Sequence, residues 1–267
     1  MSVLQVNKAS FAYGGHLVLR EIDVAVNRGE FVSIIGPSGC GKSTLLSIIA
    51  GMLDPGLGTV EFDVGEDGGT ARAVVFQDFA LLPWKNVLSN VSLGLNYQRR
   101  SLTKAERARI AQKYVELVGL RGFEKKYPYQ ISGGMKQRAG LARALAVDPQ
   151  VLLLDEPFAS IDAQNAELLR RELRDLVSQQ QRTAVLVTHN LDEALYLSDR
   201  ILLMSTRPGT IREDVHVDLP FPRGPEMADP QHQARYAELR NRLWEHLVEE
   251  VAREKRWMNE TSRGGVQ

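Results

Sequence analysis

The chain has 267 residues, of which 43% are hydrophobic, so it can bury a sizeable core and disorder is not expected. Lysine plus arginine and aspartate plus glutamate each number 33, and this balance excludes an overall field that would attract nucleic acid or anionic lipid. The single cysteine, Cys40, excludes an internal disulfide and a cysteine-based metal cage, and no apolar run reaches the roughly 18 residues needed to cross a bilayer.

The first 35 residues begin without the basic and apolar segments of a secretory signal and have the pattern of β-strands. Strands are expected over 4–12, 17–26 and 31–35, with turns at Tyr13-Gly14-Gly15 and Asn27-Arg28-Gly29. The third run is almost wholly apolar, which is typical of a strand covered on both faces. These patterns predict an N-terminal antiparallel β subdomain that leads into a buried sheet.

The next part of the chain is expected to contain one helix and two short strands. The helix covers 42–50 and ends at Gly51, and residues 54–70 have the glycine and aspartate content of a hairpin around a strand at 59–64. A second short strand is expected at 73–76.

Residues 84–148 are expected to form a largely helical insertion, in which Thr103 and Glu106 have the spacing of a capped helix start. Beyond it, strands and helices alternate, which predicts a mostly parallel sheet with helices on both faces. The strands are expected at 151–154, 184–188 and 200–205, and the helices at 164–180 and 192–197.

The C-terminal part combines a linker and a helical tail. The linker is rich in proline, at Pro220, Pro222, Pro225 and Pro230. The tail has apolar residues at helical spacing, at Tyr236, Leu239, Leu243, Leu247 and Val251, and we expect this stripe to pack on the helix's own domain. The predicted organisation is one domain over 1–220, with the helical subdomain inserted at about 84–148, and a linker and tail over 221–267.

A nucleotide-binding loop is predicted between the third strand and the first helix, in the segment Gly36-Pro37-Ser38-Gly39-Cys40-Gly41-Lys42-Ser43-Thr44. Its glycines let successive N–H groups point inward, toward phosphates at a helix N-terminus. Lys42 can reach the terminal phosphates, the Ser43 hydroxyl is placed to ligate Mg²⁺, and Thr44 assists at the phosphates. The alternative is a merely flexible loop. Cys40 is interpreted as a small filler, because nothing in the sequence activates it as a nucleophile.

Two acids, Asp155 and Glu156, follow the apolar run at 151–154. In a phosphate-loop fold, ligands bind at the C-terminal edge of the strands, so these acids can divide the work of hydrolysis. Asp155 would hold Mg²⁺ through its water shell, and Glu156 would orient and polarise the water that attacks the γ-phosphate. The alternative is a pair of solvated turn residues.

A hydroxyl and two glycines, Ser132-Gly133-Gly134, stand at the start of a predicted helix. This is a second candidate anion site, or a plain helix cap. Because one nucleotide can occupy only one such loop within a chain, two phosphate sites suggest two chains that share each ATP.

These motifs, followed by Thr188-His189, occur in the order found in ABC transporter ATPases, and the resemblance covers about residues 3–215. It implies a P-loop NTPase fold of the ABC ATPase type: α/β, with a mostly parallel core sheet, an N-terminal antiparallel β subdomain and an inserted helical subdomain. It also implies transport-coupled hydrolysis of ATP to ADP and phosphate by a homodimer of cassettes, with ATP and Mg²⁺ as ligands.

The resemblance assigns three catalytic positions, Glu156, His189 and Gln77. Gln77 senses Mg²⁺ and the attacking water, so that Ser43, Gln77 and Asp155 form the metal set. His189 resembles the family's switch histidine, which contacts the γ-phosphate and helps to hold the water; the alternative is an ordinary strand-end residue.

The family's pattern also assigns contacts with the nucleotide from both chains. Ser132, Gly133 and Gly134 contact the γ-phosphate of ATP held by the other protomer. Tyr13 matches the aromatic on which adenine stacks, and the alternative is an aromatic in the core. Ser160-Ile161-Asp162 resembles the loop that crosses the dimer interface, with Asp162 bracing the opposite site.

The chain departs from the family's pattern at three positions. Ile131 stands where leucine is usual, Met135 where glutamine is commonest, and Asn190 where aspartate often follows the switch histidine. The change at Met135 removes any contact through a glutamine side chain but leaves the backbone donors unaffected.

Within the family, the sequence is most similar to those of the ATPase subunits of nitrate, sulfonate and taurine importers. The resemblance lies in Gln77 with Leu81-Leu82-Pro83-Trp84, Ser132-Gly133-Gly134-Met135, Asp192-Glu193-Ala194 with Asp199-Arg200, and Arg207-Pro208-Gly209. It implies integral membrane permease subunits as partners, an extracytoplasmic solute-binding protein as an indirect one, no nucleic acid, and a peripheral position on the cytoplasmic face of the cell membrane.

The connection over 79–84 is unusually apolar, and exposed patches of this kind usually mark a partner surface. We hypothesise that it lines the groove that receives a short helix of the membrane subunit. The alternative is a buried hairpin inside the helical insertion.

Other functions stay open at this point: an importer ATPase for another small solute, a soluble ABC-type ATPase that acts on DNA or the ribosome, an idle regulatory cassette, or an exporter. The sequence lacks the second cassette and the long coiled-coil insertion that soluble ABC-type ATPases usually show. It also lacks the fused membrane span that is common in exporters. Lys42, Asp155, Glu156 and His189 are all present, which argues against an idle cassette.

Overall fold

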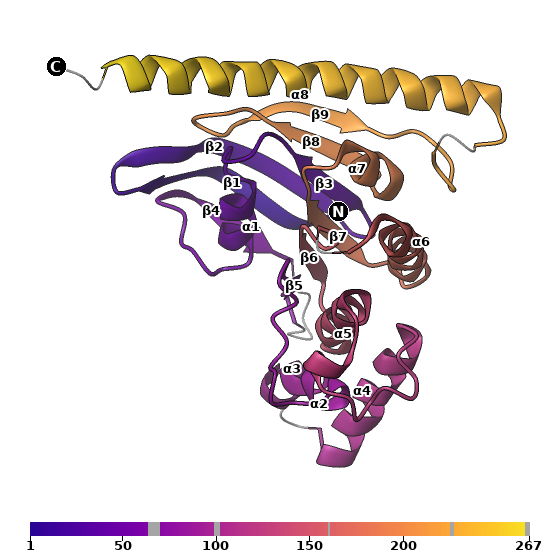
Figure 1. Ribbon diagram of the computed structural model, residues 1–267. Coiled ribbons are helices and arrows are strands. Elements are labelled where there is room, and N and C mark those ends of the chain that lie inside the picture. Colours follow the sequence, from indigo (N-terminus) through magenta and orange to yellow (C-terminus); the bar gives the residue numbers. More distant parts are fainter. Residues whose placement is uncertain (64–69, 99–101, 160, 225–226, 265–267) are drawn as a thin grey trace. The chain divides into compact units, whose positions relative to one another are not determined.

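A computed structural model describes residues 1–63, 70–98, 102–159, 161–224 and 227–264. Contacts within the chain divide it into two compact units, whose elements are labelled in Figure 1. The helical unit comprises residues 62–184 together with Met1, and the sheet unit comprises residues 2–61 and 185–267.

The sheet unit begins with the predicted antiparallel subdomain. Strands β1 (Ser2–Tyr13) and β2 (His16–Asn27) pair antiparallel, and β4 (Leu57–Phe62) lies on the other side of β1. Along β2, Ile22, Val24 and Val26 are buried and the residues between them are exposed, which is the alternation of a strand with one solvent face. The strand expected at 59–64 is present as β4, while the hairpin expected over 54–70 includes residues 64–69, which lie outside the described part of the chain.

The second group of strands in the sheet unit lies in the order β7 (Thr183–Val187), β3 (Phe31–Ile35), β8 (Arg200–Met204) and β9 (Ile211–His216). Strands β3 and β8 are parallel, whereas β9 returns antiparallel to β8. All residues of β3, β7 and β8 are buried, as expected for parallel strands covered on both faces. The sequence analysis misses β9, because its residues are too polar for a core strand and it lies at the edge of this order.

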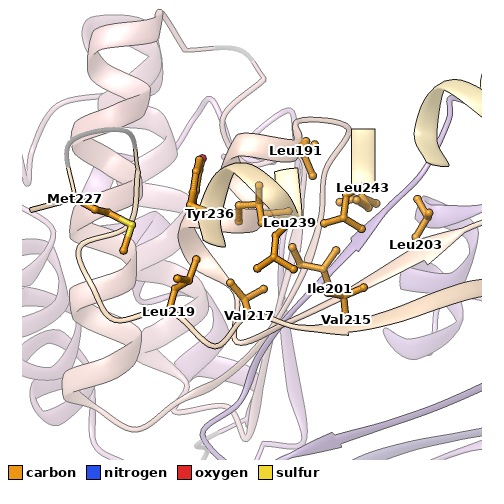
Figure 2. Close-up of a cluster of buried hydrophobic side chains, with 13 residues drawn as sticks. Leu191, Ile201, Leu203, Val215, Val217, Leu219, Met227, Tyr236, Leu239 and Leu243 are labelled. Atoms are coloured by element: carbon orange, nitrogen blue, oxygen red, sulfur yellow. The ribbon is translucent and has the colours of Figure 1, made fainter. Parts of the chain in front are cut away.

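The C-terminal tail is one long helix, α8 (Pro230–Gly264), which lies along β8 and β9 (Figure 1). Figure 2 shows its residues Tyr236, Leu239 and Leu243 among buried side chains of α7 (Leu191–Leu197), β8 and β9, and Leu247 packs against the same cluster. The predicted packing of the apolar stripe on its own domain is therefore confirmed for these four residues. It is wrong for Val251, which is 38% exposed.

The proline-rich segment before α8 is also packed. Leu219 and Met227 belong to the cluster of Figure 2, and Pro225 lies outside the described residues. The Arg223 guanidinium is buried 3.9 Å from the Phe221 ring and donates hydrogen bonds to the backbone carbonyls of Leu195, Val217, Ser198 and Leu219. A charge this deeply buried is stable only when its donors are satisfied, so these bonds define the path of the chain into α8.

The helical unit contains the parallel strands β5 (Arg72–Val75) and β6 (Val151–Asp155), with Val75 opposite Leu154. Its helices are α2 (Val87–Val91), α3 (Leu93–Gln98), α4 (Lys104–Leu117), α5 (Gly133–Ala146) and α6 (Ala163–Gln179). Helices α2, α4 and α5 pack on one another. In the described part of the chain, no helix combines the length and the apolar character needed to span a membrane.

The predicted start of α4 is confirmed in detail. The Glu106 N–H donates to the Thr103 hydroxyl at 3.3 Å, and the Thr103 N–H donates to the Glu106 carboxylate at 2.7 Å. Hydrogen bonds from the Thr103 hydroxyl and N–H hold the pKa of Glu106 below its usual value. Two residues recognised from their spacing thus form a complete capping box.

We predict that Leu243→Ala lowers the free energy of unfolding by about 2–5 kcal/mol, because Leu243 is fully buried and its removal leaves a cavity. The matched change Val248→Ala, on the exposed side of the same helix, should alter it by less than about 0.5 kcal/mol. Urea unfolding followed by circular dichroism measures both. Equal effects of the two substitutions would contradict the packing of α8 on the sheet unit.

Candidate functional site

The segment 36–44 runs from the end of β3 into the start of α1 (Lys42–Ile49), as expected. Gly39 and Gly41 have φ angles of 77° and 102°, a left-handed conformation that glycine adopts without strain. A Cβ on Gly41 would lie 2.6 Å from a methyl group of Leu19, so the loop packs tightly on β2. Gly41 occupies the N-cap of α1 and has no side chain to cap the helix, which leaves its N-terminus suited to an anion.

The Lys42 side chain is 6% exposed and folds back across the loop. Its ammonium donates hydrogen bonds to the carbonyl oxygens of Gly36 and Pro37, each at 2.8 Å, and lies 3.9 Å from the Cys40 sulfur. A cation is therefore held inside the curve of the loop. Ser43 is exposed and Thr44 half-buried, on the first turn of α1.

Cys40 is 1% exposed, and burial raises the pKa of its thiol, while the nearby Lys42 ammonium opposes this shift. A raised pKa keeps the thiol protonated and unreactive near neutral pH. This environment fits the interpretation of Cys40 as a filler.

His189 follows β7 in the sheet unit, and the residues on either side hold its backbone. The buried Thr188 hydroxyl donates to the Glu193 carboxylate at 2.7 Å and accepts from the Asn190 N–H at 3.0 Å. The Thr188 N–H donates to the Ile34 carbonyl at 3.2 Å, which brings the exposed His189 next to the point where the chain leaves β3.

The departure at Asn190 has a structural explanation. Its side-chain oxygen accepts from the N–H groups of Asp192 at 2.9 Å and Glu193 at 3.2 Å, so it caps α7. Asparagine and aspartate are about equally good at this position, and the substitution leaves the helix start intact.

Tyr13 lies at the turn between β1 and β2 and is 51% exposed, which excludes the alternative of a core aromatic. Its ring meets Phe11 edge to face, with centroids 4.7 Å apart. The aromatic surface left in solvent can stack on a planar ligand.

In the helical unit, Asp155 is the last residue of β6 and Glu156 follows it with a φ of 42°. For a residue with a side chain, this left-handed conformation costs roughly 1–2 kcal/mol and turns the chain sharply. Both acids are half-buried. Since Val75 of β5 lies opposite Leu154, Gln77 emerges at the same strand edge as the two acids.

Two further predicted site residues are helix N-caps in the helical unit. Ser132 caps α5 and accepts from the Met135 N–H at 3.3 Å. Asp162 caps α6 and accepts from the backbone and side-chain N–H groups of Asn165 at 3.1 and 2.8 Å, bonds that lower the pKa of its carboxyl group. The plain-cap interpretation of Ser132 is therefore observed, and contact of Ser132, Gly133 and Gly134 with a phosphate stays a prediction. Ser160 lies outside the described residues.

The apolar connection over 79–84 is held by two side chains that the sequence analysis did not single out. The Arg143 guanidinium donates to the carbonyls of Phe79 at 2.9 Å and Ala80 at 2.5 Å, and burial lowers its pKa. Fully buried Asn90 exchanges hydrogen bonds with the N–H and carbonyl of Leu82 at 2.8 and 3.2 Å. Trp84, at the end of this connection, is 70% exposed, which contradicts the alternative of a buried hairpin.

The candidate residues thus form two sets. The sheet unit holds Tyr13, the loop 36–44 and His189, and the helical unit holds Gln77, Ser132–Gly134, Asp155, Glu156 and Asp162. Among the described residues, no three His, Cys, Asp or Glu side chains gather to bind a metal by themselves. Ser43, Gln77 and Asp155 each carry a side-chain oxygen of the kind that Mg²⁺ prefers, and binding of the metal by these residues stays a prediction.

The chain is similar to several known proteins. A family model described as "ABC transporter" matches residues 19–159. An uncharacterized ABC transporter ATP-binding protein of Methanocaldococcus jannaschii is 44% identical over 90% of this chain and 89% of its own length. The nitrate import ATP-binding protein NrtD of Synechococcus elongatus is 39% identical, over 90% of this chain and 88% of its own length.

A solved structure is also similar. The dimeric ATP-binding cassette MJ0796 bound to ADP and Pi superposes with a TM-score of 0.69 at 30% identity, and the match covers 83% of this chain and 99% of that one. The bicarbonate transport ATP-binding protein CmpC of Synechococcus elongatus is 42% identical over 91% of this chain but only 37% of its own length.

The chain belongs to the ABC transporter family and has the fold of its ATPase cassette. The family and the fold together make it an ATPase, and the predicted fold class is confirmed.

We predict that Cys40 in the folded chain does not react with the thiol reagent DTNB at pH 7 during the time in which the guanidinium-unfolded chain reacts fully. Because the folded pKa is raised, the thiolate fraction and the rate should keep increasing above pH 9. Absorbance at 412 nm follows this sole thiol. Equal rates for folded and unfolded chains would refute the burial of the Cys40 side chain.

Proposed function

We propose that this ATPase energises uptake of a small anion as the ATP-binding subunit of an ABC importer, working as a dimer on the cytoplasmic face of the cell membrane. The observation that carries the ATP site is the Lys42 ammonium, held within a loop whose glycines open its backbone at the start of α1. A triphosphate can replace the carbonyl partners of that ammonium and accept from the loop's N–H groups.

We propose the following division of roles around ATP. Loop residues 36–44 bind the phosphates and Tyr13 stacks on adenine. Ser43, Gln77 and Asp155 would hold Mg²⁺, which neutralises phosphate charge when bound. In the nucleotide-bridged dimer, Ser132, Gly133 and Gly134 approach the γ-phosphate held by the partner, and Asp162 braces that site.

Hydrolysis requires a water aligned with the γ-phosphorus. The water oxygen forms a bond to this phosphorus as the bond between the phosphorus and the oxygen of ADP breaks. Glu156 is proposed to orient and polarise this water. Gln77, which emerges at the same strand edge, is proposed to sense it. His189 is proposed to contact the γ-phosphate and hold the water. ATP bound between the two cassettes would hold them together. After hydrolysis the cassettes would separate, and they and the permease halves bound to them would return to their starting positions.

The transported solute is proposed to be a small anion such as nitrate, a sulfonate or taurine. Support comes from relatives named for nitrate import and bicarbonate transport. An extracytoplasmic binding protein would deliver the solute. The solute can be identified by testing which of nitrate, taurine and bicarbonate stimulates ATP hydrolysis by the transporter purified with its permease.

We predict that Glu156→Gln slows ATP hydrolysis roughly 10²–10³-fold, because the amide cannot polarise the attacking water as the carboxylate does. ATP binding should persist, and size-exclusion chromatography should show a dimer trapped by ATP. Lys42→Ala is the contrasting variant, and it should lose binding of a fluorescent ATP analogue. Phosphate release by Glu156→Gln near the wild-type rate would remove Glu156 from its proposed role.

We propose that the apolar connection over 79–84 receives a short helix of the permease. Arg143 and Asn90 hold its backbone while Trp84 stays exposed, so an aromatic anchor is presented on a rigid support.

Trp84→Glu should therefore abolish co-purification with the permease and solute-stimulated hydrolysis, while basal hydrolysis by the isolated cassette is retained. Leu168→Glu, at a position 55% exposed on α6, serves as the control and should assemble normally. Normal assembly of the Trp84→Glu variant would refute the proposed docking surface.

A further inference from the structure

The face of α8 that packs on the sheet unit is apolar at first and becomes acidic toward the C-terminus of the helix. Tyr236, Leu239, Leu243 and Leu247 face the apolar cluster, and the next inward position in this spacing is Glu250, which is 0% exposed. Glu254 follows one turn later, with its side chain 13% exposed. Two acids thus continue a face that apolar residues begin, and a buried carboxylate needs specific partners.

Glu250 finds these partners on the turn between β8 and β9, on β9 itself and on α8. Its carboxylate accepts from the Thr206 N–H at 3.0 Å and the Thr206 hydroxyl at 3.3 Å. The same carboxylate pairs with Arg212 of β9 at 2.7 Å and with Arg253 at 3.1 Å. The helix is therefore fastened to the segment 205–209 through charge-assisted hydrogen bonds.

The segment 205–209, which is the turn between β8 and β9, packs against the backbone of the phosphate loop 36–44. Its Gly209 N–H donates to the Val18 carbonyl at 2.8 Å, and its carbonyl accepts from the Arg20 N–H at 3.0 Å. A Cβ on Gly209 would overlap the Cys40 carbonyl oxygen, so the two backbones are in direct contact. Any displacement of this segment would therefore be transmitted to Cys40.

Glu254 makes a second connection of the same kind. Its carboxylate lies 3.7 Å from the Arg207 guanidinium, and a Cβ on Gly39 would come within 3.6 Å of it. One face of α8 thus reaches both the support of the phosphate loop and the loop itself.

We propose that Glu250 is a positioning residue for the ATPase reaction, because it holds the segment 205–209 against the phosphate loop and so keeps the loop's N–H groups in place for ATP. The proposal rests on ATP binding at 36–44 and extends the nucleotide site to the C-terminal helix. The contacts that make up this support all lie in the sheet unit, whereas Glu156 and Gln77 belong to the helical unit. Loss of the support should therefore weaken binding of ATP more than it slows the chemical step.

The test compares Glu250→Ala, Glu250→Gln and Glu249→Ala in the full chain. Glu249 also pairs with Arg212 but is exposed, so it controls for loss of that ion pair. In Glu250→Ala, the KM for ATP and the Kd of a fluorescent ATP analogue should rise roughly five- to tenfold, while kcat falls less than about twofold. Glu250→Gln keeps volume and one acceptor, and should show a rise of about twofold.

A local readout accompanies these constants. The reaction of Cys40 with DTNB should accelerate in Glu250→Ala at a temperature where circular dichroism shows a folded chain, and stay at the wild-type rate in Glu249→Ala. An unchanged KM and an unchanged thiol rate in folded Glu250→Ala would overturn the proposal, as would equal effects of Glu249→Ala. If Glu250→Ala does not fold, a wild-type KM and thiol rate in Glu250→Gln would overturn it.

Lys42→Ala separates this inference from the ATP site itself. If the wild-type chain and Lys42→Ala bind the analogue equally, the proposed nucleotide site is wrong. If only Lys42→Ala loses binding while Glu250→Ala behaves as wild type, the site stands and the role of Glu250 is wrong.

Discussion

The site depends first on one buried cation in a tightly curved backbone. The Lys42 ammonium is nearly withdrawn from solvent and is stabilised by the carbonyls of Gly36 and Pro37. That geometry requires left-handed glycines on either side of Cys40, close packing on β2, and a backbone surface beneath the loop that Gly209 supplies. The neighbouring sheet, the β8–β9 turn and the C-terminal helix all contribute to keeping this short curve of chain in place.

Most of the fold was predictable because its elements carry strong local signals. Strands β3, β7 and β8 are short runs of buried residues, and the capping box of α4 is readable from two residues. The positions of the loop 36–44, of Asp155 and of Ser132 followed from motifs that stand at element boundaries. The chemical roles of these residues stay predictions.

The features that the sequence analysis missed are not marked by a periodic pattern in the sequence. Strand β9 is polar because it lies at an edge, and Arg143 and Asn90 act on residues far away along the chain. The tail is the clearest case. Helical spacing from Leu247 admits either position 250 or 251, and hydrophobicity favours Val251, yet the helix turns Glu250 inward. Only the location of Thr206 and Arg212 explains that choice, and tertiary contacts of this kind cannot be read from a stripe of apolar residues.

The cap at Asn190 has a consequence for the start of helix α7, which follows His189 in the chain. An aspartate at this position holds the first turn of its helix best when ionised, and it would lose acceptor strength once acidified. The amide oxygen of Asn190 bears no titratable proton, so the bonds it accepts from α7 do not themselves change with acidity. The start of α7, next to His189, is thereby anchored by a neutral group.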